Sequence, residues 1–332
     1  MLFKKKIDVV SIGDTATDAF IRIKDAHVHC ALDKTACELC FGFGDKIPYE
    51  SVTVVPGVGN SANAAVAMSR LGLTTSFISN VGDDGFGKEC IETLEHVGVG
   101  TRYMLKHKGI PTSYHYILWY DNERTILTRH EDYKYTLPSF PEPRWMYLSS
   151  LGAGAKEFHN DVAQYLLEHK NVKLAFQPGT FQIKLGAAAL KNIYERTEVF
   201  VCNLEEAQKI LETQENDAKK LIDMLRTKGP KIVVITDGPQ GAYAGDGTKT
   251  YYMAAYPDER PAFERTGAGD AFASTLVTFL IKGKTLAEAL KLAPINSASV
   301  VQKIGSQAGL LDEKGILEWL AKAPEGYGSK EI

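Results

Sequence analysis

The sequence predicts an α/β protein with a mostly parallel central sheet, helices on both faces of that sheet and a small β-rich lid. Short apolar runs alternate with helical patterns along the chain, which is typical of βαβ units. Two β-rich segments interrupt this alternation. The 332 residues are enough to bury a large core, and 44% hydrophobic with 24% charged residues is ordinary for a soluble globule.

The apolar runs and the helical patterns follow one another with no long linker between them. Strands are predicted over residues 7–12, 75–80, 145–149, 173–176, 199–202 and 231–236. Helices are predicted over residues 61–71, 87–97, 156–169, 205–211, 218–228, 268–282 and 286–303. No internal repeat divides the chain.

The two β-rich segments cover residues 19–55 and 103–128. We expect them to meet above one edge of the sheet as lid insertions, and to close over a ligand. The core then consists of residues 1–18, 56–102 and 129–332.

Composition and charge exclude several classes of function. The net charge of −3 and the pI near 6.3 give no electrostatic case for nucleic acid or an anionic membrane as a partner. The basic N-terminus lacks the pattern of a signal peptide, and the apolar run 271–281 is too short to span a bilayer. Five cysteines, an odd number, predict reduced thiols. We therefore expect a cytoplasmic protein.

A zinc site is one alternative. Cys37 and Cys40 form a C-x-x-C pair, and Cys30, His27 and His29 precede it. No second pair follows, and the surrounding residues are typical of an apolar strand. We expect no metal at these cysteines.

The motif that indicates chemistry lies at residues 266–270. Gly267, Ala268 and Gly269 precede Asp270 at the entrance to an apolar helix. Their backbone amides can approach an anion closely, and the helix dipole adds positive potential. A carboxylate beside a bound phosphate suits a general base that takes a proton from an attacking hydroxyl.

A rival motif suggests a dinucleotide. Gly57, Gly59 and Ala62 fit the pattern G-x-G-x-x-A, and Asp83 follows about twenty residues later. Pro56 stands in the turn, however, and this interpretation leaves the 266–270 motif unexplained. No G-x-x-x-x-G-K-[ST] motif occurs, which excludes a P-loop enzyme.

Taken together, the motifs resemble those of the ribokinase or PfkB-type carbohydrate kinases, in family order from residue 7 to about residue 310. The loop 13–18 resembles the post-strand loop whose last Asp contacts the sugar, and residues 81–87 resemble the family's G-D-D-x-F-G loop. Asp270 matches the catalytic Asp. The resemblance implies a ribokinase-like fold, and it implies acceptor-binding roles for Asp18, Gly59, Asn60 and Asn63.

The resemblance also implies a nucleotide site with ATP and Mg²⁺. Asn203 and Glu206 match an N-x-x-E motif tied to Mg²⁺ and phosphate, and Glu206 is expected to reach the metal through water. Residues of two further segments are expected to contact the nucleotide: Thr236, Gly238 and Gly241 at its phosphates, and Asn296 at its adenine. By themselves, Asn203 and Glu206 equally fit an ordinary helix start.

Three departures from the family pattern concern the substrate and a monovalent cation. Val58 replaces a glycine, Glu264 replaces an Asp, and residues 177–180 lack the charges found in many ribokinases. Activation by K⁺ is therefore an open expectation.

The sequence as a whole predicts ATP-dependent phosphorylation of a sugar or a sugar-like polyol. A nucleoside is the alternative substrate, with Tyr114, Tyr116 and Trp119 as a surface for its base. A non-catalytic sugar- or nucleotide-sensing protein is the alternative from another class, disfavoured by the intact motif at Asp270. A homodimer through the lid is a further expectation.

Overall fold

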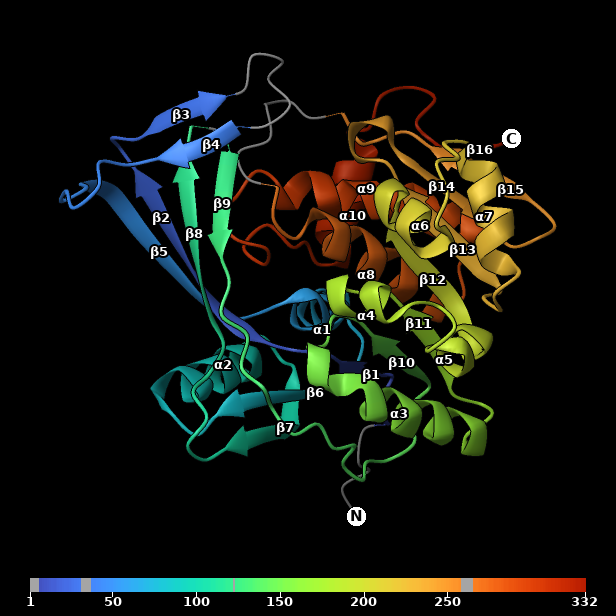
Figure 1. Ribbon diagram of the computed structural model, residues 1–332. Helices are drawn as coiled ribbons and strands as arrows, with labels where there is room; N and C mark the ends of the chain where they lie inside the picture. Colours follow the sequence, from blue (N-terminus) through green and yellow to red (C-terminus); the bar gives the residue numbers. More distant parts are fainter. Residues whose placement is uncertain (1–5, 31–36, 122, 258–264) are drawn as a thin grey trace.

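The computed structural model describes residues 6–30, 37–121, 123–257 and 265–332. Within these ranges, ten strands form one sheet in the order β16-β15-β14-β13-β12-β11-β10-β1-β6-β7 (Figure 1). Seven neighbouring strands of this sheet, β7, β6, β1, β10, β11, β12 and β13, pair in parallel. Strands β14, β15 and β16 extend one edge in antiparallel fashion. Their bounds are β1 Val9–Ile12, β6 Thr75–Gly82, β7 Gly100–His107, β10 Trp145–Leu148, β11 Lys173–Phe176, β12 Thr197–Asn203, β13 Ile232–Thr236, β14 Ala242–Gly245, β15 Thr250–Met253 and β16 Lys330–Glu331.

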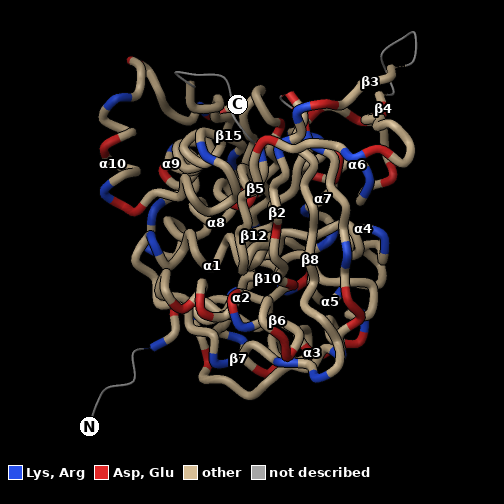
Figure 2. Tube along the Cα trace, turned by 90° about the vertical axis from the view of Figure 1, so that its left-hand side faces the viewer, with Lys and Arg blue, Asp and Glu red and all other residues tan. Residues whose placement is uncertain are grey.

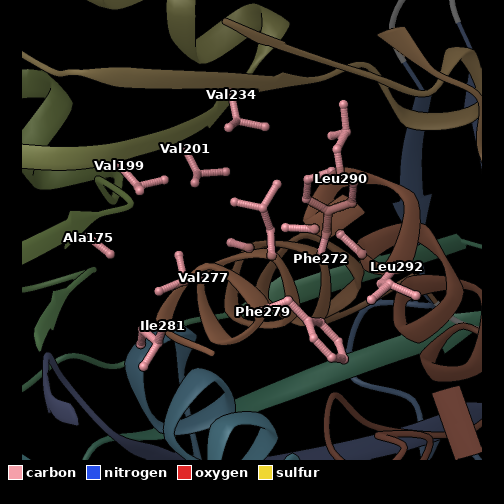
Figure 3. Packing of buried hydrophobic residues seen from close by; sticks show 14 of the residues in the cluster. Ala175, Val199, Val201, Val234, Phe272, Val277, Phe279, Ile281, Leu290 and Leu292 are labelled. Atoms are coloured by element: carbon pink, nitrogen blue, oxygen red, sulfur yellow. The ribbon is translucent and has the colours of Figure 1, made fainter. Parts of the chain in front are cut away.

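The central strands are apolar on both faces because helices cover both. On one face, Val9, Tyr147 and Val201 belong to a cluster that includes side chains of α8. Figure 3 shows Val201 of the sheet above the helix that carries Val277. On the other face lie Val10 and Leu148. The first face is covered by α1 Asn60–Arg70, α8 Ala268–Ile281, α9 Leu286–Val300 and α10 Glu313–Ala321; the second is covered by α3 Lys156–Glu168, α5 Lys191–Arg196, α6 Leu204–Leu211 and α7 Ala218–Arg226.

A second sheet of four strands stands beside the main body, and we call it the lid (left of Figure 1). Its strands are β2 Ala16–Ile23, β5 Tyr49–Val58, β8 Tyr114–Tyr120 and β9 Glu123–Leu127, in the order β5-β2-β8-β9. Strands from the two β-rich parts of the sequence meet in this sheet, because β2 pairs in parallel with β8.

One face of the lid is turned toward the core. Phe20 and Val55 lie on this face against Gly305, where an added Cβ would come within 3.3 Å of the Val55 side chain. Asp18 is on the same face as Phe20, because alternate residues of a strand share a face. The lid therefore directs Asp18 toward the main body.

The boundaries of the predicted elements differ from the structure mainly at edges. The sequence places residues 103–128 in the lid, whereas β7 pairs with β6 in the main sheet. Apolar periodicity did not predict β14, β15, β16 and α10, nor the short helices α4 Thr180–Leu185 and α5. Strands of two to four residues and helices of six to nine residues have little apolar periodicity of their own, so tertiary packing decides them. Helix α2, Gly85–His96, lies close to its predicted range.

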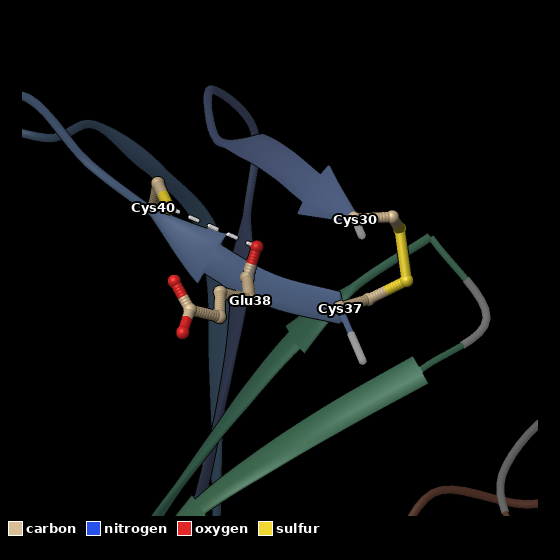
Figure 4. The surroundings of a disulfide bond; sticks show 4 residues. All are labelled: Cys30, Cys37, Glu38 and Cys40. Carbon is tan, nitrogen blue, oxygen red and sulfur yellow. Dashed lines mark hydrogen bonds between the residues drawn. A yellow bond between two sulfur atoms is a disulfide. The ribbon is translucent and has the colours of Figure 1, made fainter. Parts of the chain in front are cut away.

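The prediction of five reduced thiols is wrong for two of them. Strands β3 His27–Cys30 and β4 Cys37–Cys40 form a hairpin at the top of the lid, and Cys30 is bonded to Cys37 (Figure 4). An odd cysteine count cannot reveal that two of the residues occupy directly opposed positions of a hairpin. Cys40 keeps its thiol, and no group of three or more metal-binding side chains occurs in the described residues.

Charged residues of both signs are interspersed along the fold (Figure 2). None of the helices in the described ranges has the length and apolar character needed to cross a membrane. In open parallel sheets ligands bind at the carboxyl ends of the strands, so the candidate site is sought at this edge of the main sheet.

Candidate active site

Asp270 is the centre of a network that joins three distant parts of the chain. It lies in the first turn of α8 and is 7% exposed. Oδ1 accepts hydrogen bonds from Asn60 Nδ2 at 2.9 Å and from Gln177 Nε2 at 3.1 Å. Oδ2 accepts one from Asn63 Nδ2 at 2.8 Å. Three side-chain amides from α1 and from the loop after β11 thus hold one carboxylate.

Two hydrogen bonds to its oxygen determine the orientation of the Asn63 side-chain amide. Its Oδ1 accepts hydrogen bonds from Ser306 Oγ at 2.8 Å and from Gln307 Nε2 at 3.0 Å. Both partners are buried donors, so the Asn63 NH₂ group must face Asp270. The loop between α9 and α10 thereby contributes to the site without contacting Asp270.

Two opposed effects act on the pKa of Asp270. Burial raises the pKa of the carboxyl, because desolvation disfavours its charged form. The hydrogen bonds from Asn63, Gln177 and Asn60 lower it, because they stabilise the charged form. Burial is the larger effect, so the pKa lies above the ordinary value, as suits a proton acceptor.

The glycines around Asp270 have different reasons to be glycine. Gly267 caps α8 with φ 81°, and a Cβ there would lie 2.4 Å from Ser306 Cβ. Gly59 has φ 126°, and a Cβ there would lie 2.6 Å from Asp14 O. Gly269 faces open space, with no atom within 4 Å of an added Cβ. A space of this kind above a helix N-terminus can admit an anion.

Asp18 lies on β2 and is paired across the lid. Its Oδ1 is 3.1 Å from His115 Nδ1 on β8, directly opposite in register. The His115 ring contacts His130 at 4.9 Å between centroids, and His130 contacts Phe181 on α4 at 5.9 Å. This row of rings connects the lid to the main body next to the loop that holds Gln177.

Asp14 is a carboxylate that the sequence analysis did not single out. It follows β1, and Tyr135 Oη donates to its Oδ1 at 3.0 Å and its Oδ2 at 2.9 Å. Burial raises the pKa of Asp14 to about 6, and the bond from Tyr135 offsets only part of this effect. Its position after the first strand was the available signal, since side chains there reach the carboxyl edge of the sheet.

Asn203 and Glu206 form a reciprocal cap at the start of α6. Asn203 Oδ1 accepts a hydrogen bond from the backbone N–H of Glu206 at 2.8 Å, and Glu206 Oε2 accepts one from the backbone N–H of Asn203 at 2.9 Å. Burial raises the pKa of Glu206, and the charge of Asp270 raises it further. The helix-start interpretation is therefore confirmed, and the capping bond uses Oε2 of Glu206 and not Oε1.

Thr236 is in register with Asn203 on the neighbouring strand, so the predicted nucleotide residues gather at one end of the edge. Gly238 begins a short 3-10 helix with φ 50°. Gly241 has φ 100°, and a Cβ there would lie 2.3 Å from Met253 O. Gly241 is thus required where the backbone passes β15.

Asn296 does not take the predicted position. It is 0% exposed on α9, its Nδ2 donates to Thr275 Oγ1 at 2.8 Å, and its Oδ1 accepts from the Leu311 amide at 2.9 Å. Both ends of the amide are used inside the core, so its side chain offers no surface for an adenine. In the sequence, an Asn among small helical residues does not distinguish a contact to adenine from hydrogen bonding inside the core.

The rival dinucleotide interpretation fails on topology. Gly57 lies in β5 and Gly59 connects β5 to α1, and β5 is an antiparallel strand of the lid. A dinucleotide fingerprint needs a strand of the parallel sheet before its helix. No sequence motif indicated Gln177 and Tyr147 as site residues, because their contacts depend on how the strands pair.

Comparison with known proteins shows the family of the chain. Residues 7–313 match the model of the pfkB family carbohydrate kinases. An ATP-dependent 6-phosphofructokinase of Thermoanaerobacterium thermosaccharolyticum is 24% identical over 329 residues, covering 93% of this chain and 92% of that protein. A ribokinase of Bacillus subtilis is 26% identical over 289 residues, covering 84% and 92%.

Solved structures show the same fold. A nucleoside kinase of Methanocaldococcus jannaschii, described as an archaeal member of the ribokinase family, has a TM-score of 0.78 at 19% identity, covering 96% of this chain and 99% of that one. Arabidopsis thaliana ribokinase, complexed with ribose and ATP, has a TM-score of 0.76 at 18% identity, covering 95% and 99%. The match over residues 7–313 decides the assignment: the chain belongs to the PfkB family of carbohydrate kinases and is a phosphotransferase.

Proposed function

We propose that this chain transfers the γ-phosphoryl group of ATP to a hydroxyl of an unphosphorylated sugar, sugar-like polyol or nucleoside, with Asp270 as the general base. The observation that carries the proposal is the position of Asp270. A buried carboxylate with a raised pKa lies in the first turn of a helix, beside open space at Gly269.

In the proposed step, Asp270 takes the proton of the acceptor hydroxyl while the oxygen of that hydroxyl attacks the γ-phosphorus of ATP. The bond between the γ-phosphorus and the bridging oxygen breaks, and this oxygen leaves with ADP. The amides of Gly267, Ala268 and Gly269 hold the phosphoryl oxygens. Because these donors are fixed by the helix, they need no reorganisation as charge develops.

The nucleotide is assigned to the edge formed by β12 and β13, at Asn203, Thr236, Gly238 and Gly241. The residues there fit Mg²⁺ bound with ATP, because Glu206 has an oxygen outside its capping bond, and carboxylate oxygens suit this ion. When bound, Mg²⁺ neutralises charge on the phosphates. Glu206 would orient one of the ion's waters.

The acceptor is assigned to the space between the lid and α1, with Asp18, Gly59, Asn60 and Asn63 as contacts. The described partners of Asp18, Asp14 and Asp270 are a histidine, a tyrosine and amides, with no Lys or Arg among them. A phosphorylated acceptor would meet three carboxylates whose own partners carry no fixed positive charge. This favours a neutral acceptor.

A nucleoside is the second candidate acceptor, and the ring cluster of His115, His130 and Phe181 favours it. These rings can stack on a base beside Asp18. The predicted lid surface does not serve this purpose as a whole: Tyr114 and Tyr116 contact each other on the opposite face of β8 from His115.

A screen of unphosphorylated sugars, polyols and nucleosides with MgATP, read as ADP formation, tests the proposal. Turnover that depends on one acceptor class supports it, and faster turnover with a phosphosugar contradicts the neutral-acceptor assignment. Saturable binding of a sugar or nucleotide without turnover of any acceptor would favour the sensing protein instead.

Activation by K⁺ is proposed as well. Its predicted determinant Glu264 lies outside the described residues, so the support is the family pattern of backbone oxygens around residues 266–270. Rates in K⁺ and in tetramethylammonium at equal ionic strength decide it, because equal rates mean that no activating site exists.

We propose that two copies pair through the outer face of the lid. Val54 and Tyr116 are each 48% exposed there, and Leu127 is 51% exposed. Phe86 extends this apolar face through its contact with Tyr114, 4.9 Å between centroids. An exposed apolar sheet face can pair with its own copy across a two-fold axis.

Sedimentation velocity tests the dimer. We expect Val54→Lys to give a monomer and Leu317→Lys, an exposed apolar position on α10, to leave the dimer intact. A wild-type protein that sediments as a monomer at all concentrations would contradict the pairing.

A further inference from the structure

Tyr147 lies beneath the active site without reaching it. It is on β10, it is 0% exposed, and its hydroxyl donates to Gln177 Oε1. Gln177 Nε2 in turn donates to Asp270 Oδ1 at 3.1 Å. A hydroxyl in the core of the sheet is thus connected to Asp270 through one amide.

The sheet places the two residues on the same face. Tyr147 is in register with Ala175 on β11. The backbone N–H of Gln177 donates to Leu148 O at 2.9 Å, so the hydrogen-bond ladder between β10 and β11 continues past the end of β11. Residues two apart along a strand share a face, so Gln177 follows Ala175 toward α8. Backbone pairing therefore brings Gln177 under Asp270.

The direction of both hydrogen bonds is determined. Burial raises the pKa of Tyr147 far above its ordinary value, and the charge of Asp270 raises it further, so the phenol keeps its proton. The opposite amide orientation would place the Gln177 carbonyl against a carboxylate oxygen, with no proton between them. Tyr147 therefore keeps the NH₂ group of Gln177 on Asp270.

The two oxygens of Asp270 are occupied unequally. Oδ1 accepts two hydrogen bonds, from Asn60 and Gln177, whereas Oδ2 accepts one, from Asn63. A carboxylate oxygen has two lone pairs, so an acceptor hydroxyl finds a vacant one on Oδ2.

We propose that Tyr147 and Gln177 are a positioning pair, which occupies Oδ1 of Asp270 and leaves Oδ2 as the atom that receives the acceptor's proton. The inference rests on the proposed role of Asp270 as base. Neither residue touches the substrate; both act through the orientation of the carboxylate.

The titration of Asp270 tests the pair without any acceptor. Protein labelled with ¹³C at the aspartate carboxyl carbons gives a resonance for Asp270, assigned by its loss in Asp270→Asn. Gln177→Met removes a donor to the charged form and should raise the pKa of Asp270 by about 1, since a hydrogen bond to a charged group contributes about 1.5 kcal/mol. Tyr147→Phe should raise it less, by freeing the Gln177 amide.

Tyr194→Phe is the matched control. Tyr194 is 2% exposed and packs against Phe176 and Phe200 on the other face of the sheet, so this variant also removes one buried hydroxyl. It should leave the Asp270 titration unchanged. An unchanged Asp270 titration in both Gln177→Met and Tyr147→Phe would overturn the inference. Gln177→Met changes a residue of a loop and not of the sheet core, so the titration can still be measured in this variant if Tyr147→Phe does not fold.

Kinetics provide the second measurement, with the acceptor that the screen identifies. Both variants should lower kcat by about tenfold, leave KM for the acceptor within twofold, and move the acidic limb of the kcat profile to higher pH. If the Asp270 titration shifts in Gln177→Met and Tyr147→Phe but Asp270→Asn is fully active, Asp270 is not the base, and the hydrogen-bonded pair is retained. If the titration does not shift in these two variants but Asp270→Asn is inactive, only the positioning pair is rejected.

Discussion

Asn63 and Asp270 are 207 positions apart in the sequence, and Asn63 Nδ2 donates to Asp270 Oδ2 at 2.8 Å. This bond connects α1, which follows strand β5 of the lid, to α8, which comes after the antiparallel strands β14 and β15. The buried faces of both helices are rich in small residues, including Ala62, Ala65 and Ala273, which permits close packing. An acceptor held at α1 and a phosphoryl group held at α8 are thereby placed on the same carboxylate.

Asp270→Asn should lower kcat by about 10²- to 10⁴-fold, the usual contribution of a general base. Its shape is retained, so nucleotide affinity should be equal or tighter, because repulsion from the phosphates is relieved. Single-turnover rates and calorimetric ATP binding check both results. Glu205→Gln, an exposed acid on α6, is the control; more than about a tenth of wild-type kcat in Asp270→Asn would remove Asp270 from the base role.

Gly267→Ala and Gly269→Ala should separate stability from activity. Ala at 267 meets both a left-handed backbone at φ 81° and Ser306 Cβ at 2.4 Å, so we expect a loss of at least about 2 kcal/mol. Ala at 269 lies in open space on a helix and should leave stability within about 1 kcal/mol. Its methyl group enters the proposed phosphoryl site, so activity should fall. Denaturant unfolding and kcat of both variants check this, and a fully active Gly269→Ala would place the phosphoryl group elsewhere.

Asp14→Asn should make the protein more stable at neutral pH. The folded-state pKa is raised to about 6 from 3.8, so the folded protein holds a proton that the unfolded chain has lost, and stability falls as pH rises between these values. Asn removes this penalty while still accepting from Tyr135. The gain in unfolding free energy should be on the order of 2 kcal/mol at pH 7 and should vanish near pH 3.5.

Urea unfolding at several pH values checks the Asp14 prediction. Asp246→Asn is the control, because hydrogen bonds lower the pKa of Asp246 and its loss should destabilise the protein at neutral pH. A gain in Asp14→Asn that does not change with pH would show that the charge is not its cause.

Glu206→Gln should raise the Mg²⁺ concentration needed for half-maximal rate by about tenfold, as loss of an outer carboxylate does at other metal sites. The cap should survive, because Gln can still accept from the Asn203 amide. Rates at fixed ATP over a Mg²⁺ series measure this, with melting temperature as the check on the fold. Equal Mg²⁺ dependence in wild type and Glu206→Gln would mean that Glu206 only caps α6.

The sequence alone determined what depends on neighbouring residues. The apolar runs predicted the parallel strands, because strands buried on both faces need apolar side chains at every position. The segment 266–270 indicated an anion site at a helix start, since a glycine turn followed by an apolar helix is a local pattern. Asn203 and Glu206 indicated a cap for the same reason.

The tertiary structure alone decided what depends on distant partners. Asn60 and Gln177 reach Asp270 across 210 and 93 positions, and no spacing rule connects such residues before the sheet order is known. The same limit explains the misplaced Asn296, whose partners lie on α8 and before α10, and the bond between Cys30 and Cys37, which depends on hairpin register. Residue type and local order fixed the kind of chemistry, whereas strand order and register fixed which side chains meet, because contacts across a sheet depend on pairing that no single segment encodes.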